Sequence, residues 1–477
     1  MGQEISQSHF SQHDFDQFRR QLNRETQLLG QLLQNNSFAD TELIAGLEIE
    51  SWLVDKAMRP SPINEQYLAT INEPLASAEL AKFNIELNTH PLALSETIFS
   101  DLHSQLKKTW NNASHHAESM NSALMMIGIL PTLKPSDLTI ANMSGLNRYR
   151  ALNEEILKTQ EKPIHLDITG VEHLDHYHDD IMLESATTSL QLHTKVPLSI
   201  GHHYYNASIM ASAAMVAICG NAPFLFGKNL WHETRIPLFE QAVNLGGYNG
   251  AAHGPIKRVS FGTGYARHSL LECFEENLHH FPILLPEELS SDIENFSHLK
   301  LHNGTIWRWN RPLIGCDNDG KPHLRIEHRA PAAGPTLVDT VANATFYFGL
   351  TKNLCDQIIE SGQLLPFSTA RDNFYHAARY GLNSHMHWFK DSRQRMYTLL
   401  SNELLPRAMA GLEKLHITKS ESEYYLNIIK SRLAAKQTGS DWQRQFFEKQ
   451  GQDFTALSSQ YLSNQQQDIP VSEWQTR

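Results

Sequence analysis

Four separated segments of this chain alternate apolar residues with acidic, imidazole or guanidinium side chains, and this alternation constrains the fold most strongly. In the first segment, GLEIESWL, the apolar Leu47 and Ile49 fall on one side of an extended strand while Glu48 and Glu50 fall on the other. The other three segments are 83–88 (FNIELN), 190–196 (LQLHTKV) and 324–329 (LRIEHR). One such strand is typical of a solvated sheet surface, whereas four with Glu, His and Arg at the polar positions indicate a sheet with one specialised face.

The polar positions of these strands predict a site for a divalent cation. If the strands share a sheet, the side chains that converge on one surface are those of Glu48, Glu50, Glu86, His193 and Glu327. Four carboxylates on one surface repel one another unless a cation neutralises them. Carboxylate oxygens with one imidazole suit Mg²⁺, or Mn²⁺, better than zinc.

Two arginines beside these carboxylates add the chemistry of phosphate binding. Arg325 and Arg329 lie on the same segment as Glu327, and guanidinium groups match phosphate geometry. Metals and arginines together are typical of phosphoryl transfer. Neither GxxxxGK[ST] nor a GxGxxG after a strand occurs in the sequence. We therefore expect any ATP to be held by metals and arginines on the sheet face.

The rest of the chain predicts an α+β fold. We expect a largely antiparallel sheet with one metal- and ATP-binding face, helices on its other face and a helical C-terminal third. The expected divisions are an N-terminal helical segment (1–40), a catalytic sheet domain (41–340) and a helical region packing on the same unit (341–477). The helices are expected at 14–36, 97–120, 205–219, 338–361, 373–387, 391–412, 421–436 and 441–462, and a loop at 245–254.

Composition limits the partners of this chain. Lys and Arg number 40 against 52 Asp and Glu, a formal net charge of −12, which argues against a nucleic-acid partner. No apolar stretch is long enough to cross a membrane, and the polar N-terminal residues predict no targeting segment. The four cysteines lack CxxC spacing and are expected as reduced thiols. We expect a cytoplasmic protein that acts on small molecules.

A histidine-rich segment, EHLDHYHDD at 172–180, could suggest a transition-metal site. It lacks a helical spacing such as HExxH. A solvated loop over the active site is the better prediction.

The order and spacing of several motifs resemble the glutamate–cysteine ligase family of the carboxylate–amine ligase type, which has a glutamine-synthetase-like catalytic fold. The resemblance rests first on GLEIESWLVD (46–55), on AELAKFNIELNTHP (78–91) and on LESATTSLQLHTKV (183–196). Further matching segments are 218–242, 301–312, 324–339 and 371–384. The loop after Arg329 departs from the family pattern at Ala330 and Pro331, which leaves the exact substrate open.

The resemblance implies an ATP-dependent ligase. In the family, ATP phosphorylates the γ-carboxylate of glutamate and an amine attacks the acyl phosphate. L-cysteine as the amine would make this the first step of glutathione biosynthesis. The implied cofactors are ATP and Mg²⁺, or Mn²⁺, and the implied metal ligands are Glu48, Glu50, Glu79, Glu86, His193 and Glu327.

The resemblance also assigns roles to polar residues that are not metal ligands. Arg329 would contact the transferring phosphoryl group, and Arg235 would bind a substrate carboxylate. Arg311 is a second candidate for phosphate or carboxylate, and Gln191 could orient a ligand or a water molecule.

Two other functions stay open at this point. A metal-dependent amide hydrolase could use the same Glu and His face with a metal-bound water and no ATP. The arginines beside the carboxylates argue against it, because a hydrolase has less need of a phosphate clamp. A non-catalytic binding protein with the same fold would be expected to lack a ligand position, and none is missing.

Overall fold

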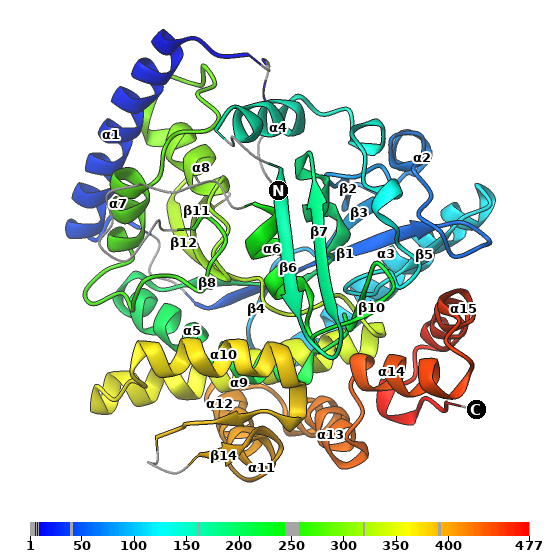
Figure 1. Cartoon of the computed structure of the whole chain (residues 1–477). Coiled ribbons are helices and arrows are strands. Elements are labelled where there is room, and N and C mark those ends of the chain that lie inside the picture. Colours follow the sequence, from blue (N-terminus) through cyan, green and yellow to red (C-terminus); the bar gives the residue numbers. More distant parts are fainter. Residues whose placement is uncertain are drawn as a thin grey trace.

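An eight-stranded antiparallel sheet forms the centre of the molecule (Figure 1). The computed structural model describes residues 5, 7, 9–38, 42–159, 163–243, 257–317, 320–389 and 393–476. The strand order is β11-β12-β8-β1-β3-β2, and β4 and β5 also pair with β1. These strands are β1 (Ile44–Val54), β2 (Ala76–Ala78), β3 (Asn84–Asn88), β4 (Leu92–Ala93), β5 (Ala123–Met125), β8 (Leu190–Val196), β11 (Asn310–Cys316) and β12 (Pro322–His328).

The four strands with the predicted polar pattern occupy consecutive places in this sheet, in the order β12-β8-β1-β3. On β1, Leu47 and Ile49 are each 1% exposed, which puts the intervening glutamates on the opposite face. The register sets Glu50 opposite Glu86 and sets His193 opposite Glu327. The predicted antiparallel sheet with a single polar face is therefore confirmed.

Helices cover the apolar face of the sheet, as predicted. The helices nearest to it are α5 (Gly201–Ile218) and α9 (Leu337–Ser361), with α3 (Ile98–Ser119) beside β1 and β3. Asn310 on β11 donates to Ser212 on α5 over 2.9 Å, and the ring of His328 on β12 stacks on Tyr347 of α9 with centroids 4.6 Å apart. Almost every residue of α5 is buried, because this helix lies between the sheet and further helices (Figure 1).

The C-terminal third is helical, with boundaries that differ from the prediction. Its helices after α9 are α10 (Phe367–Tyr380), α11 (Met396–Leu399), α12 (Leu405–Lys414), α13 (Lys419–Ala435), α14 (Gly439–Lys449) and α15 (Phe454–Gln465), with a π-helical turn at Leu400–Leu404. The segment predicted as one helix over 441–462 is two helices. Gly451 has φ +78° between them, and the Asp453 side chain caps α15.

Two other predicted helices have different boundaries in the structure. The helix predicted over 373–387 stops at Tyr380, and a short hairpin of β13 (His385–Met386) and β14 (Gln394–Arg395) follows. In the segment predicted over 391–412, residues 391 and 392 lie outside the described residues, and the helix begins at Met396.

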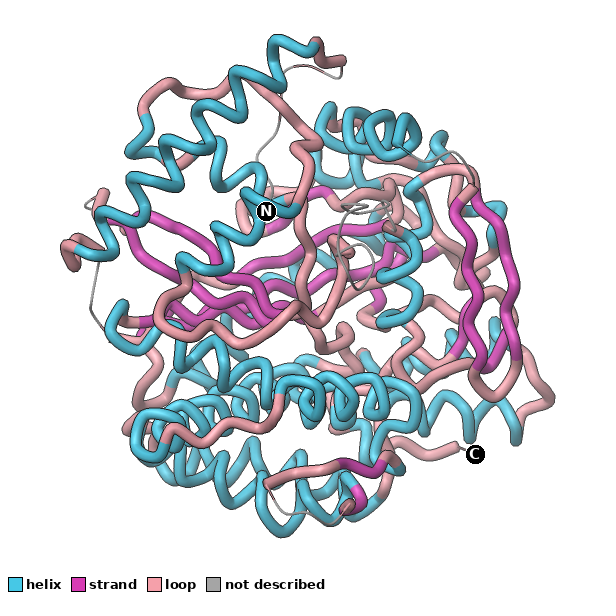
Figure 2. The backbone as a smooth tube through the Cα atoms, turned by 60° about the vertical axis from the view of Figure 1, so that its left-hand side comes forward, coloured by secondary structure: helices cyan, strands magenta, loops and turns pink. Residues whose placement is uncertain are grey.

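The polar face of the sheet has its own cover. The helices on this side are α1 (Gln12–Gln34), α4 (Asn147–Thr159), α6 (Arg235–Ala242), α7 (Leu271–His280) and α8 (Ser297–Gly304). The short helix α2 (Asn64–Thr70) instead contacts α3 through Tyr67. The remaining strands are β6 (Ile164–Thr169), β7 (His173–His178), β9 (Phe224–Leu225) and β10 (Lys228–Asn229). In the tube view, the β6–β7 ribbon stands apart from the central sheet (Figure 2). The histidine-rich segment predicted as a loop thus includes strand β7, and the loop predicted at 245–254 lies outside the described residues.

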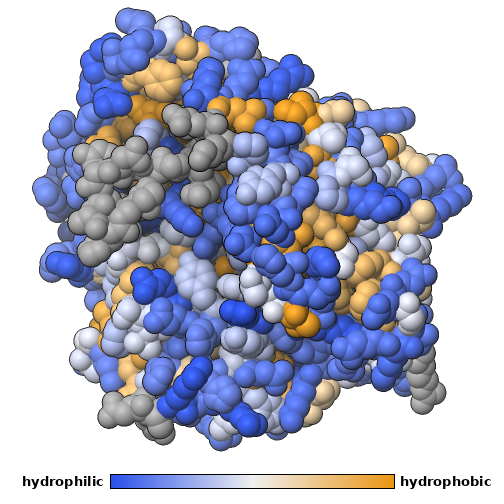
Figure 3. All heavy atoms as spheres, viewed as in Figure 1, coloured by the Kyte–Doolittle hydropathy of each residue, from blue (hydrophilic) through white to orange (hydrophobic). Residues whose placement is uncertain are grey.

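Buried apolar residues from the N-terminal helix, the sheet and the C-terminal helices form one connected core. The boundaries expected at residues 40 and 340 stay predictions. Hydrophilic residues predominate on the face seen in Figure 3, and the hydrophobic ones are scattered. Within the described part of the chain, no helix is both long and apolar enough for a membrane span.

The crossing of α9 and α12 supplies a test of this helical layer. A Cβ atom on Gly411 of α12 would overlap the carbonyl oxygen of Gly349 on α9. We expect Gly411→Ala to destabilise the chain by about 1–3 kcal/mol, through overpacking, in thermal unfolding. Gly264→Ala is the matched control, because a Cβ there meets no atom within 4 Å. An unchanged Tm for Gly411→Ala would contradict the close packing of these helices.

Candidate active site

The polar face of the sheet opens into a cavity of about 450 Å³. The cavity extends from the β2–β3 edge, at Glu79, to the β11–β12 edge, at Ile314 and Arg325. Strands are about 4.8 Å apart, so the four steps from β3 to β11 span roughly 19 Å. Every residue that the sequence predicted for the site lines this cavity: Glu48, Glu50, Glu79, Glu86, Gln191, His193, Arg235, Arg311, Glu327 and Arg329.

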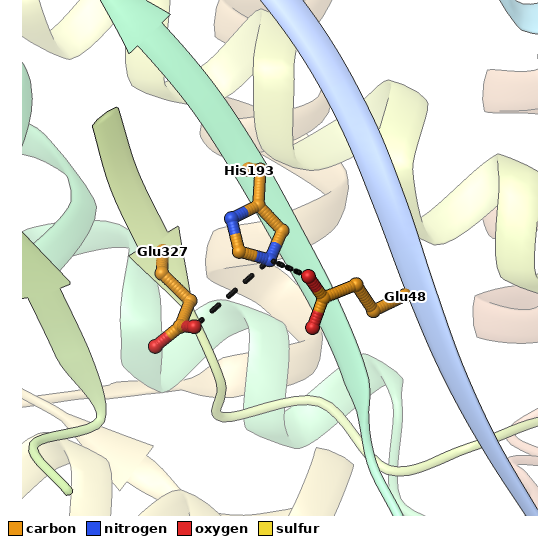
Figure 4. Close-up of side chains that lie close together, drawn as sticks. All are labelled: Glu48, His193 and Glu327. Carbon is orange, nitrogen blue, oxygen red and sulfur yellow. Dashed lines mark ion pairs between the residues drawn. The ribbon is translucent and has the colours of Figure 1, made fainter. Parts of the chain in front are cut away.

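The predicted metal ligands fall into two clusters. Cluster A consists of Glu48, His193 and Glu327, from three neighbouring strands, whose ligand atoms lie within 4.8 Å of one another (Figure 4). The Nε2 atom of His193 is 3.0 Å from a carboxylate oxygen of Glu48 and 4.0 Å from one of Glu327. Neither ring nitrogen of this buried histidine has a hydrogen-bond partner within the described structure. The three side chains therefore point toward a common position without saturating one another.

Cluster B consists of Glu50, Glu79 and Glu86, whose carboxylate oxygens also lie within 4.8 Å of one another. Glu79 does not lie on a helix; it follows strand β2 directly. Glu48 and Glu50 are two residues apart on β1, which separates the two clusters by about 7 Å along the strand. Within the described ranges, no other group of His, Cys, Asp and Glu has this geometry, and the histidines of the β6–β7 ribbon form none.

Cluster B is electrostatically unfavourable when its carboxylates are all ionised. Burial raises the pKa of Glu79 well above its usual value, and the charges of Glu86 and Glu50 raise it further. Burial, together with the charge of Glu48, raises the pKa of Glu86 to about 7. Burial also raises the pKa of Glu50, against the opposing charge of Arg329. Such a cluster must either bind protons or bind a cation.

Cluster A has the opposite electrostatic balance. Burial disfavours the charged form of Glu48, but the imidazole of His193 outweighs it and lowers the pKa of Glu48 to about 2. Burial acts in the same direction on Glu327, and the guanidinium groups of Arg311 and Arg329 outweigh it, which lowers the pKa of Glu327 far below its usual value. These two carboxylates are therefore ionised at neutral pH and available as oxygen ligands.

Both clusters fit a hard divalent cation. Five carboxylates and one imidazole are the donors that Mg²⁺ and Mn²⁺ accept. The ring of His193, whose nitrogens form no hydrogen bond in the described structure, and the crowded oxygens of cluster B are the groups that such ions would satisfy.

Gln191 connects the metal clusters to Arg329. The side-chain amide of Gln191 donates to Glu50 over 2.8 Å, and its oxygen accepts from Arg329 over 2.6 Å. Arg329 also lies 3.3 Å from Glu327. The guanidinium of Arg329 is thus fixed between clusters A and B at the wall of the cavity.

The other two predicted arginines are held by protein groups. Arg311 donates to both oxygens of Glu327, over 2.8 and 3.1 Å, and to the carbonyls of Asn303 and Gly304. Arg235 donates over 3.1 Å to buried Glu233, and its Nε has no hydrogen-bond partner in the described structure. Arg311 therefore orients Glu327, whereas Arg235 keeps a donor for another group.

The cavity is also lined by charged and polar residues that sequence reasoning missed. Glu184 lies on the short 3₁₀ helix Ile181–Ala186, Arg148 and Tyr149 lie on α4, and Lys300 lies on α8. None belongs to an alternating strand, so period-two patterning could not find them. Glu184 does fall within the segment 183–196 that carried the family resemblance, and that position was the one available signal.

A family model decides the assignment. The model of glutamate-cysteine ligase family 2 (GCS2) matches residues 44–463. The chain belongs to glutamate-cysteine ligase family 2. It is therefore a ligase, which supports the ATP-dependent reaction and disfavours the hydrolase alternative. A search of curated protein sequences finds no significant match.

Solved structures support the fold of this family 2 chain. A glutamate–cysteine ligase from Francisella tularensis, determined in complex with AMP, is similar with TM-score 0.53 at 12% identity, over 92% of this chain and 91% of that chain. A bifunctional glutathione synthetase from Pasteurella multocida gives TM-score 0.49 at 12% identity, over 93% of this chain and 54% of that chain. At this identity, the first similarity supports the fold only.

Cluster B makes a stability prediction for the metal-free family 2 chain. The pKa of Glu86 in the folded chain is raised from 4.5 to about 7. Protonated Glu86 therefore favours the folded state fully below pH 4.5, and this stabilisation is lost as the pH rises through 7. We expect Glu86→Gln to be more stable than the wild type in EDTA at pH 8, by on the order of 1–3 kcal/mol, and to match it near pH 4.5. Calorimetric unfolding at the two pH values measures this difference.

Two controls accompany the Glu86→Gln measurement. Glu413→Gln changes an exposed glutamate on α12 and should not alter the Tm at either pH. Addition of Mg²⁺ or Mn²⁺ at pH 8 should raise the Tm of the wild type more than that of Glu86→Gln. A Glu86→Gln chain that is less stable than the wild type in EDTA at pH 8 would contradict the predicted repulsion.

Proposed function

We propose that this chain is an ATP-dependent ligase that joins the γ-carboxylate of L-glutamate to an amine, with L-cysteine as the first candidate, through an acyl phosphate. The observation that carries the proposal is the position of Arg329 between two metal-ligand clusters in one cavity. Phosphoryl transfer needs fixed positive charge around the phosphoryl oxygens, and this arrangement would supply it. Membership of glutamate-cysteine ligase family 2 supports glutamate as the carboxylate substrate and cysteine as the first candidate for the amine.

The residues of the cavity would share the work as follows. Arg329 would contact the phosphoryl group, with its orientation held by Gln191 and Glu327. Clusters A and B would hold Mg²⁺ or Mn²⁺, which neutralises phosphate oxygens when bound. Arg235 would bind a substrate carboxylate through its unpartnered Nε. Arg311 would act through Glu327, whose two oxygens it holds.

The two ends of the cavity suit different substrates. The β11–β12 end combines apolar side chains with the cations Lys300 and Arg325, which suits a nucleotide base and its phosphates. The apolar residues there include Phe274, Leu285, Leu301, Leu313 and Ile314. The β2–β3 end combines Glu79 and Glu184 with Arg148, and these opposite charges suit a zwitterionic amino acid. The AMP bound to the Francisella ligase supports a nucleotide as one substrate of the present chain.

The proposed reaction also bears on the location of the protein and on its pathway. A ligase of small amino acids has no requirement for a nucleic-acid or membrane partner, so we keep the cytoplasm as the proposed location and glutathione synthesis as the proposed pathway. The loop at Ala330 and Pro331 adjoins Arg329 and differs from the family pattern, which leaves the choice of amine open. An amine other than cysteine would change the product but not the mechanism.

ADP release tests the proposed reaction. We expect release in the presence of ATP, Mg²⁺ and L-glutamate that depends on an added amine, tested with L-cysteine first and then with a panel of amino acids. EDTA should abolish the release. Amide hydrolysis without ATP, or no ADP release with any acceptor and amine, would contradict the proposal.

Variants of cluster A test the metal ligands. We expect Glu48→Gln to lower turnover at least about 100-fold, because a neutral amide binds a hard cation poorly, while leaving the chain folded. Glu327→Gln should have the same effect on turnover and should also lower the Tm, since it leaves buried Arg311 without its counter-charge. The matched control is Glu413→Gln, and calorimetric Mn²⁺ titration should show weaker binding in Glu48→Gln. Wild-type turnover in Glu48→Gln would exclude its role.

A further inference from the structure

Glu184 is a cavity carboxylate that neither metal cluster includes. In the part of the chain that the structure describes, no group donates a hydrogen bond to its carboxylate and no cation forms an ion pair with it. Other carboxylates of the cavity are differently placed. Glu50 accepts from the backbone and hydroxyl of Ser189 and from Gln191, and Glu327 is held by arginines. Glu184 thus has free acceptor capacity that faces the substrate space.

The backbone that presents Glu184 is firmly held. Its 3₁₀ helix is capped by Asp180, whose side chain accepts from the backbone N–H of Met182 over 2.9 Å. Ile181 and Leu183 are fully buried, and the N–H of Ile181 donates to Asn153 on α4. A carboxylate on such a fixed turn can be positioned toward a substrate with little loss of conformational entropy.

Glu184 shares the cavity with three charged groups that act on it. They are Arg329, Glu50 and Arg148, from β12, β1 and α4. Arg329 and Glu50 belong to the proposed phosphoryl-transfer site, and Glu184 lines the same cavity as both of them. Burial, with the charge of Glu50 added and that of Arg329 opposed, raises the pKa of Glu184 to about 7. A carboxyl group with this pKa can exchange a proton with an amine near neutral pH.

We propose that Glu184 binds the ammonium group of the attacking amine and accepts the proton that this group must lose before its nitrogen can attack. This inference rests on the proposed ligase function and deepens it. The amine nitrogen forms a bond to the acyl carbon, and the C–O bond to phosphate breaks with its electron pair leaving on phosphate. The ammonium group gives its first proton to the carboxylate of Glu184, which passes it to solvent. The second proton leaves the nitrogen as the amide forms and goes to the released phosphate or to solvent.

The attacking amine fits this position better than the amino group of the acceptor glutamate. The α-amino group of glutamate is several bonds away from its own γ-carboxyl carbon, whereas the attacking nitrogen must reach that carbon. A proton acceptor beside the phosphoryl-transfer residues is therefore suited to the attacking nitrogen.

Two nucleophiles separate these roles experimentally. The amino group of an amino acid is mostly protonated near neutral pH and needs a proton acceptor, whereas hydroxylamine is already a free base and traps acyl phosphates as hydroxamates. We expect Glu184→Gln to lose about 100-fold or more in kcat with the amino-acid amine, while it forms hydroxamate from glutamate, ATP and Mg²⁺ at close to the wild-type rate. Glu413→Gln, on the outer surface of α12, should match the wild type in both assays.

The outcomes distinguish the inference from the proposed function. No hydroxamate and no amine-dependent ADP release from the wild type would overturn the ligase proposal itself. A wild-type ligase whose Glu184→Gln variant couples the amine at an unchanged rate would overturn the role of Glu184 alone. So would an equal loss of hydroxamate formation with a raised KM for glutamate, because it would place Glu184 at the acceptor's amino group. Recovery of amine coupling by Glu184→Gln at high pH, where the free amine predominates, would support the inference.

Discussion

Repulsion among buried carboxylates on one sheet face is the constraint around which this structure is organised. Glu50, Glu79 and Glu86 are brought within 4.8 Å of one another on the wall of the cavity. That arrangement costs stability when the three are ionised, so these carboxylates must bind protons or a cation in the folded chain. Cluster A continues the same surface with an imidazole whose Nε2 atom lies 3.0 Å from Glu48 and 4.0 Å from Glu327. The polar side chains of this sheet face therefore line the candidate site at the expense of folding stability.

The opposite face of the sheet supplies the stability that the polar face lacks. Antiparallel pairing fixes the register, and register alone brings Glu50 beside Glu86 and brings His193 beside Glu327. The buried helices α5 and α9 pack on the other side and hold the strands in place. Because every side-chain position depends on this pairing, a shift of one residue in β1 would turn Glu48 and Glu50 into the apolar layer. The chemistry of the site is therefore a consequence of strand register.

Period-two patterning made the sheet and its main ligands predictable, because polar and apolar residues alternate along β3 and along most of β1, β8 and β12. The division of the ligands into two clusters was not predictable, since it depends on the order of strands and on Glu79, which follows β2. Arg311 looked like a ligand-binding cation and instead orients Glu327, a distinction that only side-chain geometry can make. Glu184 lies on a 3₁₀ turn, where no periodicity marks a residue as functional. The break between α14 and α15 was missed because the turn at Gly451 is short.

Transfer of oxygen from the acceptor carboxylate tests the account most directly. If Arg329 and the two clusters serve phosphorylation of a γ-carboxylate, L-glutamate labelled with ¹⁸O in that carboxylate must give one labelled oxygen to the phosphate released during amide synthesis. Mass spectrometry of that phosphate measures the transfer. The account predicts one ¹⁸O atom per phosphate released. Unlabelled phosphate from a chain that makes the amide would contradict it, because the carboxylate oxygen would then never have been bonded to phosphorus.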